Sequence, residues 1–159
     1  MPLSPLGIFH TVIGGGAVAC AVYLLWQYKQ IRIDLPLGKI YLLGTLLTAV
    51  SALGIFKHGS ANAAHMLAAL TIAAVVVGYI AANTTFLGAF KKYFVALCFS
   101  ATVLFHLIPT ATEILTRFPM ENPLVTSLED PLLLRTWLVI LVVFLVLLVM
   151  QMNWLRKQT

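Results

Sequence analysis

The chain has 159 residues, of which 61% are hydrophobic and only 9% charged, and it carries a formal net charge of +5. A water-soluble domain carries about 25% charged residues, so this composition excludes a soluble fold. The basic residues lie in short groups between apolar runs and not along one solvated face, so no nucleic-acid partner is expected.

Five apolar runs are long enough to cross a bilayer, which takes about 20 residues at 1.5 Å per residue. We therefore predict an all-α fold, an integral membrane helical bundle that forms a single transmembrane domain over residues 1–159. The predicted spans are residues 5–27, 38–56, 61–82, 93–116 and 132–154.

Two of these spans begin with a recognisable capping signal. Ser4 precedes Pro5 at the first span, and Ser60 or Asn62 precedes the alanine-rich third span. A side-chain oxygen at such a position accepts a hydrogen bond from a free N–H group of the first helical turn. Ser4 is therefore a predicted helix cap of the first span, and either Ser60 or Asn62 is that of the third.

Small residues four apart predict where the helices pack closely, because they let two backbones approach. The pairs are Gly15 with Ala19, Gly44 with Thr48, Ala64 with Ala68, and Ala74 with Gly78. The third helix holds two of them and is predicted to be the most central. The fifth span has neither a small-residue pair nor a polar atom for a neighbour to satisfy, so we expect it at the periphery.

The fourth span contains Pro109, which removes a backbone donor and clashes with the carbonyl of Phe105. We expect a kink there, or a helix that ends and restarts along the membrane interface.

Charge predicts the orientation of the bundle, since short loops rich in Lys and Arg stay in the cytoplasm. With five spans, seven of the ten basic residues fall on one side: Lys29, Arg32, Lys39, Lys91, Lys92, Arg156 and Lys157. We predict a bacterial inner-membrane protein whose N-terminus is outside and whose C-terminus is cytoplasmic.

The same orientation brings all four histidines, His10, His58, His65 and His106, to the outer half of the membrane. Imidazole binds haem iron and transition metals, and ionisable groups within a membrane are costly enough to suggest a function. We predict a cofactor, haem b or a transition metal ion, held by His10, His65 and His106. Glu113, seven residues after His106, would join the metal ligands or orient one of them.

Apart from His106, these residues also have a structural interpretation. His58 adjoins a lysine and a glycine in a tight loop and is expected to be solvated. His10 and His65 lie close enough to the outer surface to snorkel towards it, or they can hydrogen-bond a carbonyl of the next helix. Glu113 can simply mark the point where the fourth helix leaves the membrane.

The stretch Leu37-Gly38-Lys39-Ile40-Tyr41, followed by Ser51-Ala52-Leu53-Gly54 and flanked by His10 and His65, resembles a family of bacterial integral membrane proteins of unknown function with four to five helices. The resemblance spans residues 7–108. Where that family is expected to carry a His and an Arg before Gly-Lys-Ile-Tyr, this chain has Leu35 and Pro36. The chain is also similar in size to small b-type cytochromes of bacterial membranes. That similarity implies at most a single haem near the outer face.

Three functions stay open on the sequence alone. The first is electron transfer between a quinone and an outer acceptor through the predicted cofactor. The second is a cofactor-free accessory or assembly subunit of a larger membrane complex. The third is a small proton-coupled transporter that uses His106 and Glu113. Besides the lipid bilayer, the predicted partners are a quinone, subunits of a complex, or further copies of the chain.

Overall fold

The structure, a computed structural model, describes residues 4–55 and 62–158. Within them it is all-helical, and each predicted span corresponds to one long helix. The helices are α1 (Pro5–Tyr28), α2 (Pro36–Leu53), α3 (Ala63–Asn83), α4 (Lys91–Arg117) and α5 (Pro131–Arg156), with a short 3-10 helix, η1 (Gly88–Phe90), before α4. All five long helices are long and apolar enough to cross a membrane, which confirms the predicted fold class.

The capping signals act as predicted at α1 and α3. Ser4 Oγ accepts a hydrogen bond from the amide of Gly7 at 3.1 Å. At α3 the cap is Asn62, whose Oδ1 accepts from the amide of Ala64 at 2.9 Å. Ser60, the other candidate, lies outside the described residues. Asp130 caps α5 in the same way, so local sequence sets the start of three of the five helices.

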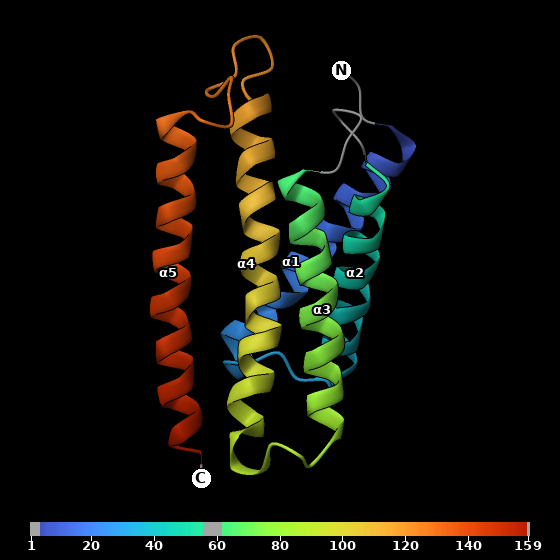
Figure 1. Cartoon of the computed structure of the whole chain (residues 1–159), viewed down its shortest axis with the longest axis vertical. Helices are drawn as coiled ribbons and strands as arrows, with labels where there is room; N and C mark the ends of the chain where they lie inside the picture. Colours follow the sequence, from blue (N-terminus) through green and yellow to red (C-terminus); the bar gives the residue numbers. More distant parts are fainter. Residues whose placement is uncertain (1–3, 56–61, 159) are drawn as a thin grey trace.

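Each long helix packs against the next one in the chain, and α4 has the most neighbours, with α5 at one edge of the bundle (Figure 1). It packs against α3, α5 and, to a smaller extent, α1, whereas α3 packs against α2 and α4. The prediction that the third helix is the most central is therefore wrong. Small residues allow close approach, but they do not determine how many helices approach.

Helix α4 runs without interruption through Pro109, so the alternative of a helix that ends and restarts is also wrong. The hydroxyls of Thr110 and Thr112 donate to the carbonyls of His106 and Ile108, at 2.7 and 2.9 Å. Threonine hydroxyls of this kind supply hydrogen bonds to the backbone around a proline in a membrane helix. Residues 109–116 belong to α4.

Glycine allows the closest helix contacts at three positions. A Cβ added to Gly14 would lie 3.1 Å from Thr48 Cγ2, and one added to Gly44 would lie 3.4 Å from the Cβ of Ala17. The tightest is Gly78, which faces α4. The predicted packing of Gly15 is wrong, because a Cβ there meets nothing within 4 Å. The face of α1 that meets α2 is one residue away.

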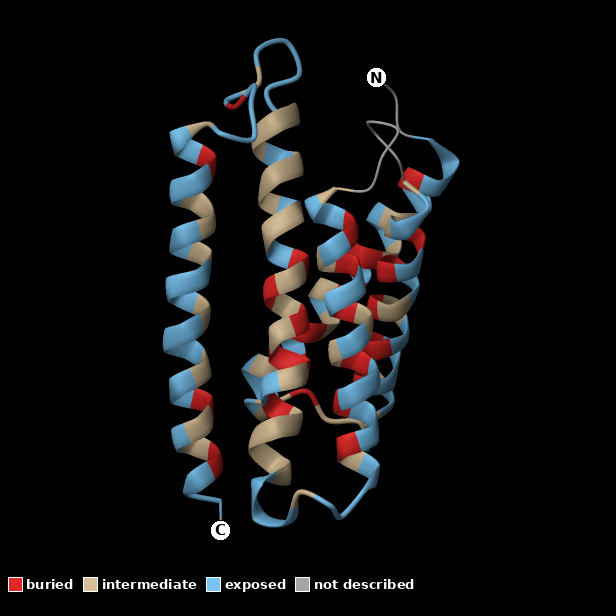
Figure 2. Cartoon of the chain, viewed as in Figure 1, coloured by how far each residue is buried: buried red, intermediate tan, exposed pale blue. Residues whose placement is uncertain are grey.

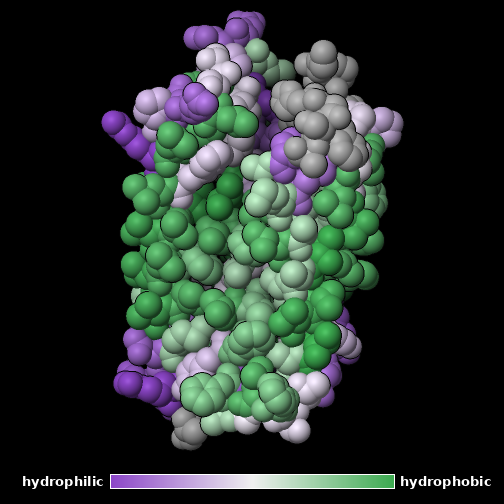
Figure 3. Space-filling model, viewed as in Figure 1, coloured by the Kyte–Doolittle hydropathy of each residue, from purple (hydrophilic) through white to green (hydrophobic). Residues whose placement is uncertain are grey.

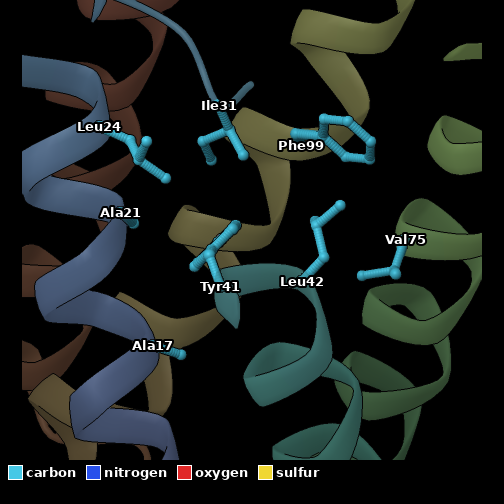
Figure 4. Close-up of a cluster of buried hydrophobic side chains, with 8 residues drawn as sticks. All are labelled: Ala17, Ala21, Leu24, Ile31, Tyr41, Leu42, Val75 and Phe99. Carbon is cyan, nitrogen blue, oxygen red and sulfur yellow. The ribbon is translucent and has the colours of Figure 1, made fainter. Parts of the chain in front are cut away.

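The core lies between α1, α2, α3 and α4, in the half of the bundle where α1 ends. Figure 4 shows its main cluster, in which the rings of Tyr41 and Phe99 lie among small and aliphatic side chains. Both rings are fully buried. Their side chains fill the space between helices that small residues bring together.

Helix α5 lies at the edge of the bundle, as predicted. Only 6% of the residues in its most apolar stretch are buried, against 39% in that of α4, and most residues of α5 are exposed in Figure 2. One part of the prediction is wrong, since Gln151 of α5 is a buried polar residue with partners on other helices. The uninterrupted run of apolar residues before it suits contact with lipid.

The surface seen in Figure 3 has a broad apolar band between two hydrophilic ends. Large apolar side chains are exposed throughout the helices, among them Val12 at 66%, Met66 at 70% and Val139 at 61%. Hydrocarbon tolerates such a surface and water does not. Together with the five helices, this is the architecture of a multi-pass membrane protein.

Candidate functional site

His10 of α1 reaches across to α2. Its Nδ1 lies 3.0 Å from the carbonyl oxygen of Thr48 and 3.1 Å from Ser51 Oγ. The Ser51 hydroxyl itself donates to the same carbonyl at 2.9 Å. Because a carbonyl oxygen only accepts, the bond to Thr48 requires a proton on Nδ1 of His10. The neutral ring then has its acceptor at Nε2.

His106 of α4 reaches the same face of α2 from the other side. Its Nε2 lies 3.2 Å from Thr45 Oγ1, and both side chains are buried. Two helices that are far apart in sequence thus direct imidazoles to one stripe of α2.

A second contact between α2 and α4 lies deeper in the bundle. Tyr41 Oη and Thr102 Oγ1 are 2.5 Å apart, and both residues are fully buried. Thr102 donates its own hydrogen to the carbonyl of Phe99 at 2.6 Å, so Tyr41 is the donor in the pair. Thr45, the partner of His106, lies one helical turn from Tyr41 on α2.

These contacts lie along one face of α2, and we call them together the polar ladder. Its members are Tyr41, Thr45, Thr48 and Ser51 of α2 with His10, Thr102 and His106. The α2 residues recur every three or four positions and so share one helix face. From Tyr41 to Ser51 the ladder covers about 15 Å of the helix axis, at 1.5 Å per residue. It links the interior of the bundle to the end where α1 begins.

His65 does not join the polar ladder through the contacts observed. Its Nδ1 lies 3.1 Å from Asn62 Oδ1 and accepts from the amide of Asn62 at 3.3 Å, which completes the capping box of α3. His65 therefore has a structural role at a helix start. Glu113 forms an ion pair with Arg117 one turn further along α4. His58 lies outside the described residues.

The predicted cofactor ligands are His10, His65 and His106, with Glu113 as a further metal ligand. The described part of the chain contains no group of three or more His, Cys, Asp or Glu side chains placed to hold a metal ion. His10 and His106 each use a ring nitrogen to bond α2, and His65 uses one to cap α3. The cofactor stays a prediction from the sequence.

Two groups of polar residues were missed in the sequence. One is the hydroxyl stripe of α2, whose spacing at positions 41, 45, 48 and 51 was a visible signal within an apolar span. The other is Gln151, whose Oε1 accepts from Ser100 at 2.8 Å and whose Nε2 donates to the carbonyl of Lys29 at 2.7 Å. These bonds connect α5 to α4 and to the end of α1.

Comparison with family models, curated proteins and solved structures finds no match to this chain. Its class is therefore defined by its own architecture, as a multi-pass membrane protein of five candidate spans. The resemblance noted for residues 7–108 stays a prediction. The polar ladder is the feature from which a function has to be argued.

Proposed function

We propose that this protein is a small proton-coupled membrane transporter in which the polar ladder carries the proton. The observation that supports the proposal is the gathering of two histidines, of which His106 is buried, beside four residues on one face of α2. Polar groups within a membrane are costly, and they characteristically mark ion or proton pathways.

The chemistry of the ladder suits proton transfer. A hydroxyl group accepts one hydrogen bond and donates another, and an imidazole takes a proton on one ring nitrogen while it releases one from the other. Its partner Thr45 lies on α2 between Tyr41 and the residues that bond His10, so we assign His106 as the group through which a proton passes along the ladder. Thr45 orients it.

The test is proton flux into vesicles that contain the purified protein and a pH-sensitive dye, driven by a potassium diffusion potential. His106→Gln removes the titrating group and Thr45→Val removes its hydroxyl partner without changing side-chain volume much. We expect each change to lower the flux by about a hundredfold, the lower end of what a positioned proton-transfer group contributes.

Thr71→Val is the matched control. Thr71 is also a buried threonine of a spanning helix, but its hydroxyl donates to the carbonyl of Leu67 within α3 and lies outside the ladder. This variant should keep the wild-type flux. Equal flux in wild type, His106→Gln and protein-free vesicles would overturn the proposal.

The same preparation separates the two other functions predicted from the sequence. A Soret band or a stoichiometric metal in the purified protein would favour the electron-transfer function over the transporter. Colourless protein that co-purifies with further subunits and conducts no protons would favour the accessory subunit.

A further inference from the structure

A depression of about 580 Å³ lies at the opposite end of the bundle from the start of α1, where α1 and α5 end and α4 begins (Figure 1). We call it the basic depression. Its lining includes Lys29 and Arg32 from the segment after α1, Lys92 from α4, and Trp154 from α5. Two separate parts of the chain therefore bring cationic side chains to one hollow, and α5 adds an aromatic ring.

The electrostatic character of the basic depression favours an anion. Lys29, Arg32 and Lys92 line it, and none of the described residues that line it is acidic. Arg32 is paired with Asp34, with Arg32 Nε 3.1 Å from Asp34 Oδ1. The charge of that arginine is thus largely balanced, while Lys29 and Lys92 each donate to a backbone carbonyl, of Trp26 and Leu155, at 2.9 and 2.8 Å.

Aromatic residues place the basic depression at the level of lipid headgroups. Lys29 Nζ lies 5.6 Å from the ring centroid of Trp26, and Lys92 Nζ lies 5.1 Å from that of Tyr93. Trp26 is 78% exposed. Exposed Trp and Tyr beside basic residues are typical of the membrane–water interface, where their rings sit among headgroups.

Apolar side chains near the basic depression can accompany acyl chains. Val22 and Tyr23 of α1, one to two turns before Lys29, are 60% and 54% exposed. On α5, Val149 and Met150 are 59% and 61% exposed. A ligand with a phosphate at the level of the lysines and hydrocarbon chains below them would match both surfaces.

We propose that the basic depression binds the phosphate of an anionic phospholipid headgroup. Basic pockets between transmembrane helices are suited to such headgroups. The bound lipid would bridge α1, α4 and α5 at an end of the bundle where Gln151 makes the observed side-chain link from α5 to the end of α1. The proposed phospholipid site is independent of the proton-transfer proposal.

The test is a lipid titration of the whole protein in neutral detergent, followed by tryptophan fluorescence because Trp154 lines the site, and by native mass spectrometry. Phosphatidylglycerol should bind at least tenfold more tightly than phosphatidylcholine, and its affinity should fall as salt is added. Lys29→Gln should weaken binding about fivefold, and Lys29→Gln with Lys92→Gln about twenty-five-fold.

Lys91→Gln with Lys39→Gln is the matched control. It removes the same charge at the same end of the bundle from residues that do not line the basic depression. Because Lys92 also donates to the carbonyl of Leu155 at 2.8 Å, the single Lys29→Gln change tests the site without disturbing the end of α5. Equal loss in the control pair would overturn the site, and inorganic phosphate binding as tightly as the lipid would overturn the assignment to a lipid.

Discussion

Gly78 is where α3 and α4 approach most closely, so its replacement by alanine is a direct test of the helix packing. An added Cβ would lie 2.7 Å from Phe99 Cε1 and 2.8 Å from Cys98 Cβ. The ring can tilt, but the Cβ of Cys98 is fixed to the backbone of α4. The helices must then separate by roughly 0.6 Å to reach the 3.4 Å at which ordinary contact begins.

A separation of this size forfeits about a quarter to a half of each dispersion contact along the interface. Overpacking of a close-packed interior typically costs about 1–3 kcal/mol. We therefore expect Gly78→Ala to lower the free energy of unfolding by about 2 kcal/mol. The measurement is a denaturant titration in mixed micelles, followed by circular dichroism.

Gly15→Ala is the control, because a Cβ at Gly15 meets nothing within 4 Å. Alanine in a helix interior is favoured over glycine by roughly 0.5–1 kcal/mol, so this variant should be as stable as wild type or slightly more so. If Gly78→Ala unfolds at the same denaturant concentration as Gly15→Ala, the close approach of α3 and α4 at Gly78 is wrong.

Three further predictions test the loop after α1, the attachment of α5 and an exposed ion pair. Gly38→Ala should lower the free energy of unfolding by about 3 kcal/mol or more in the same titration, because the new Cβ would lie 1.7 Å from the carbonyl oxygen of Arg32. An unfolding midpoint equal to that of wild type would contradict this packing. Gln151→Leu should destabilise by about 1–3 kcal/mol, since it leaves the buried hydroxyl of Ser100 without its acceptor, and an unchanged midpoint would show that this bond contributes nothing. The pKa of the Asp34 carboxyl should lie below its ordinary value of 3.8, chiefly because Arg32 hydrogen-bonds it, and carboxyl NMR would measure this. The small stabilising effect of the ion pair should be present at neutral pH and disappear as the pH falls through that lowered pKa.

The sequence was sufficient to predict the spans because the signals for them are local. An apolar run of some 20 residues predicts a helix that crosses the membrane, and capping residues such as Ser4 and Asn62 predict where that helix begins. The peripheral place of α5 also followed from its composition. None of these inferences requires knowledge of which helix meets which.

The errors arose where one helix meets another. Gly14 faces α2 whereas Gly15 meets nothing, although the two differ by one residue and hence by about 100° around α1. The small-residue pattern was present at both, and only the position of α2 distinguishes them. Likewise the hydroxyl and carbonyl partners that His10 and His106 have on α2 depend on how the helices meet, and the sequence did not predict them.

The pairing of α1 with α2 connects the two proposed sites through the register of one hairpin. At one end of the pair, Gly38 packs against the backbone of Arg32 in the segment that lines the basic depression. At the other, His10 bonds Thr48 and Ser51. The two attachments lie about 20 Å apart along α2. Because α2 is one continuous helix, a shift along α1 at one attachment also shifts the other. A substitution at Gly38 that shifts α2 along α1 should therefore weaken phospholipid binding and lower proton flux together, whereas Lys29→Gln should affect phospholipid binding alone.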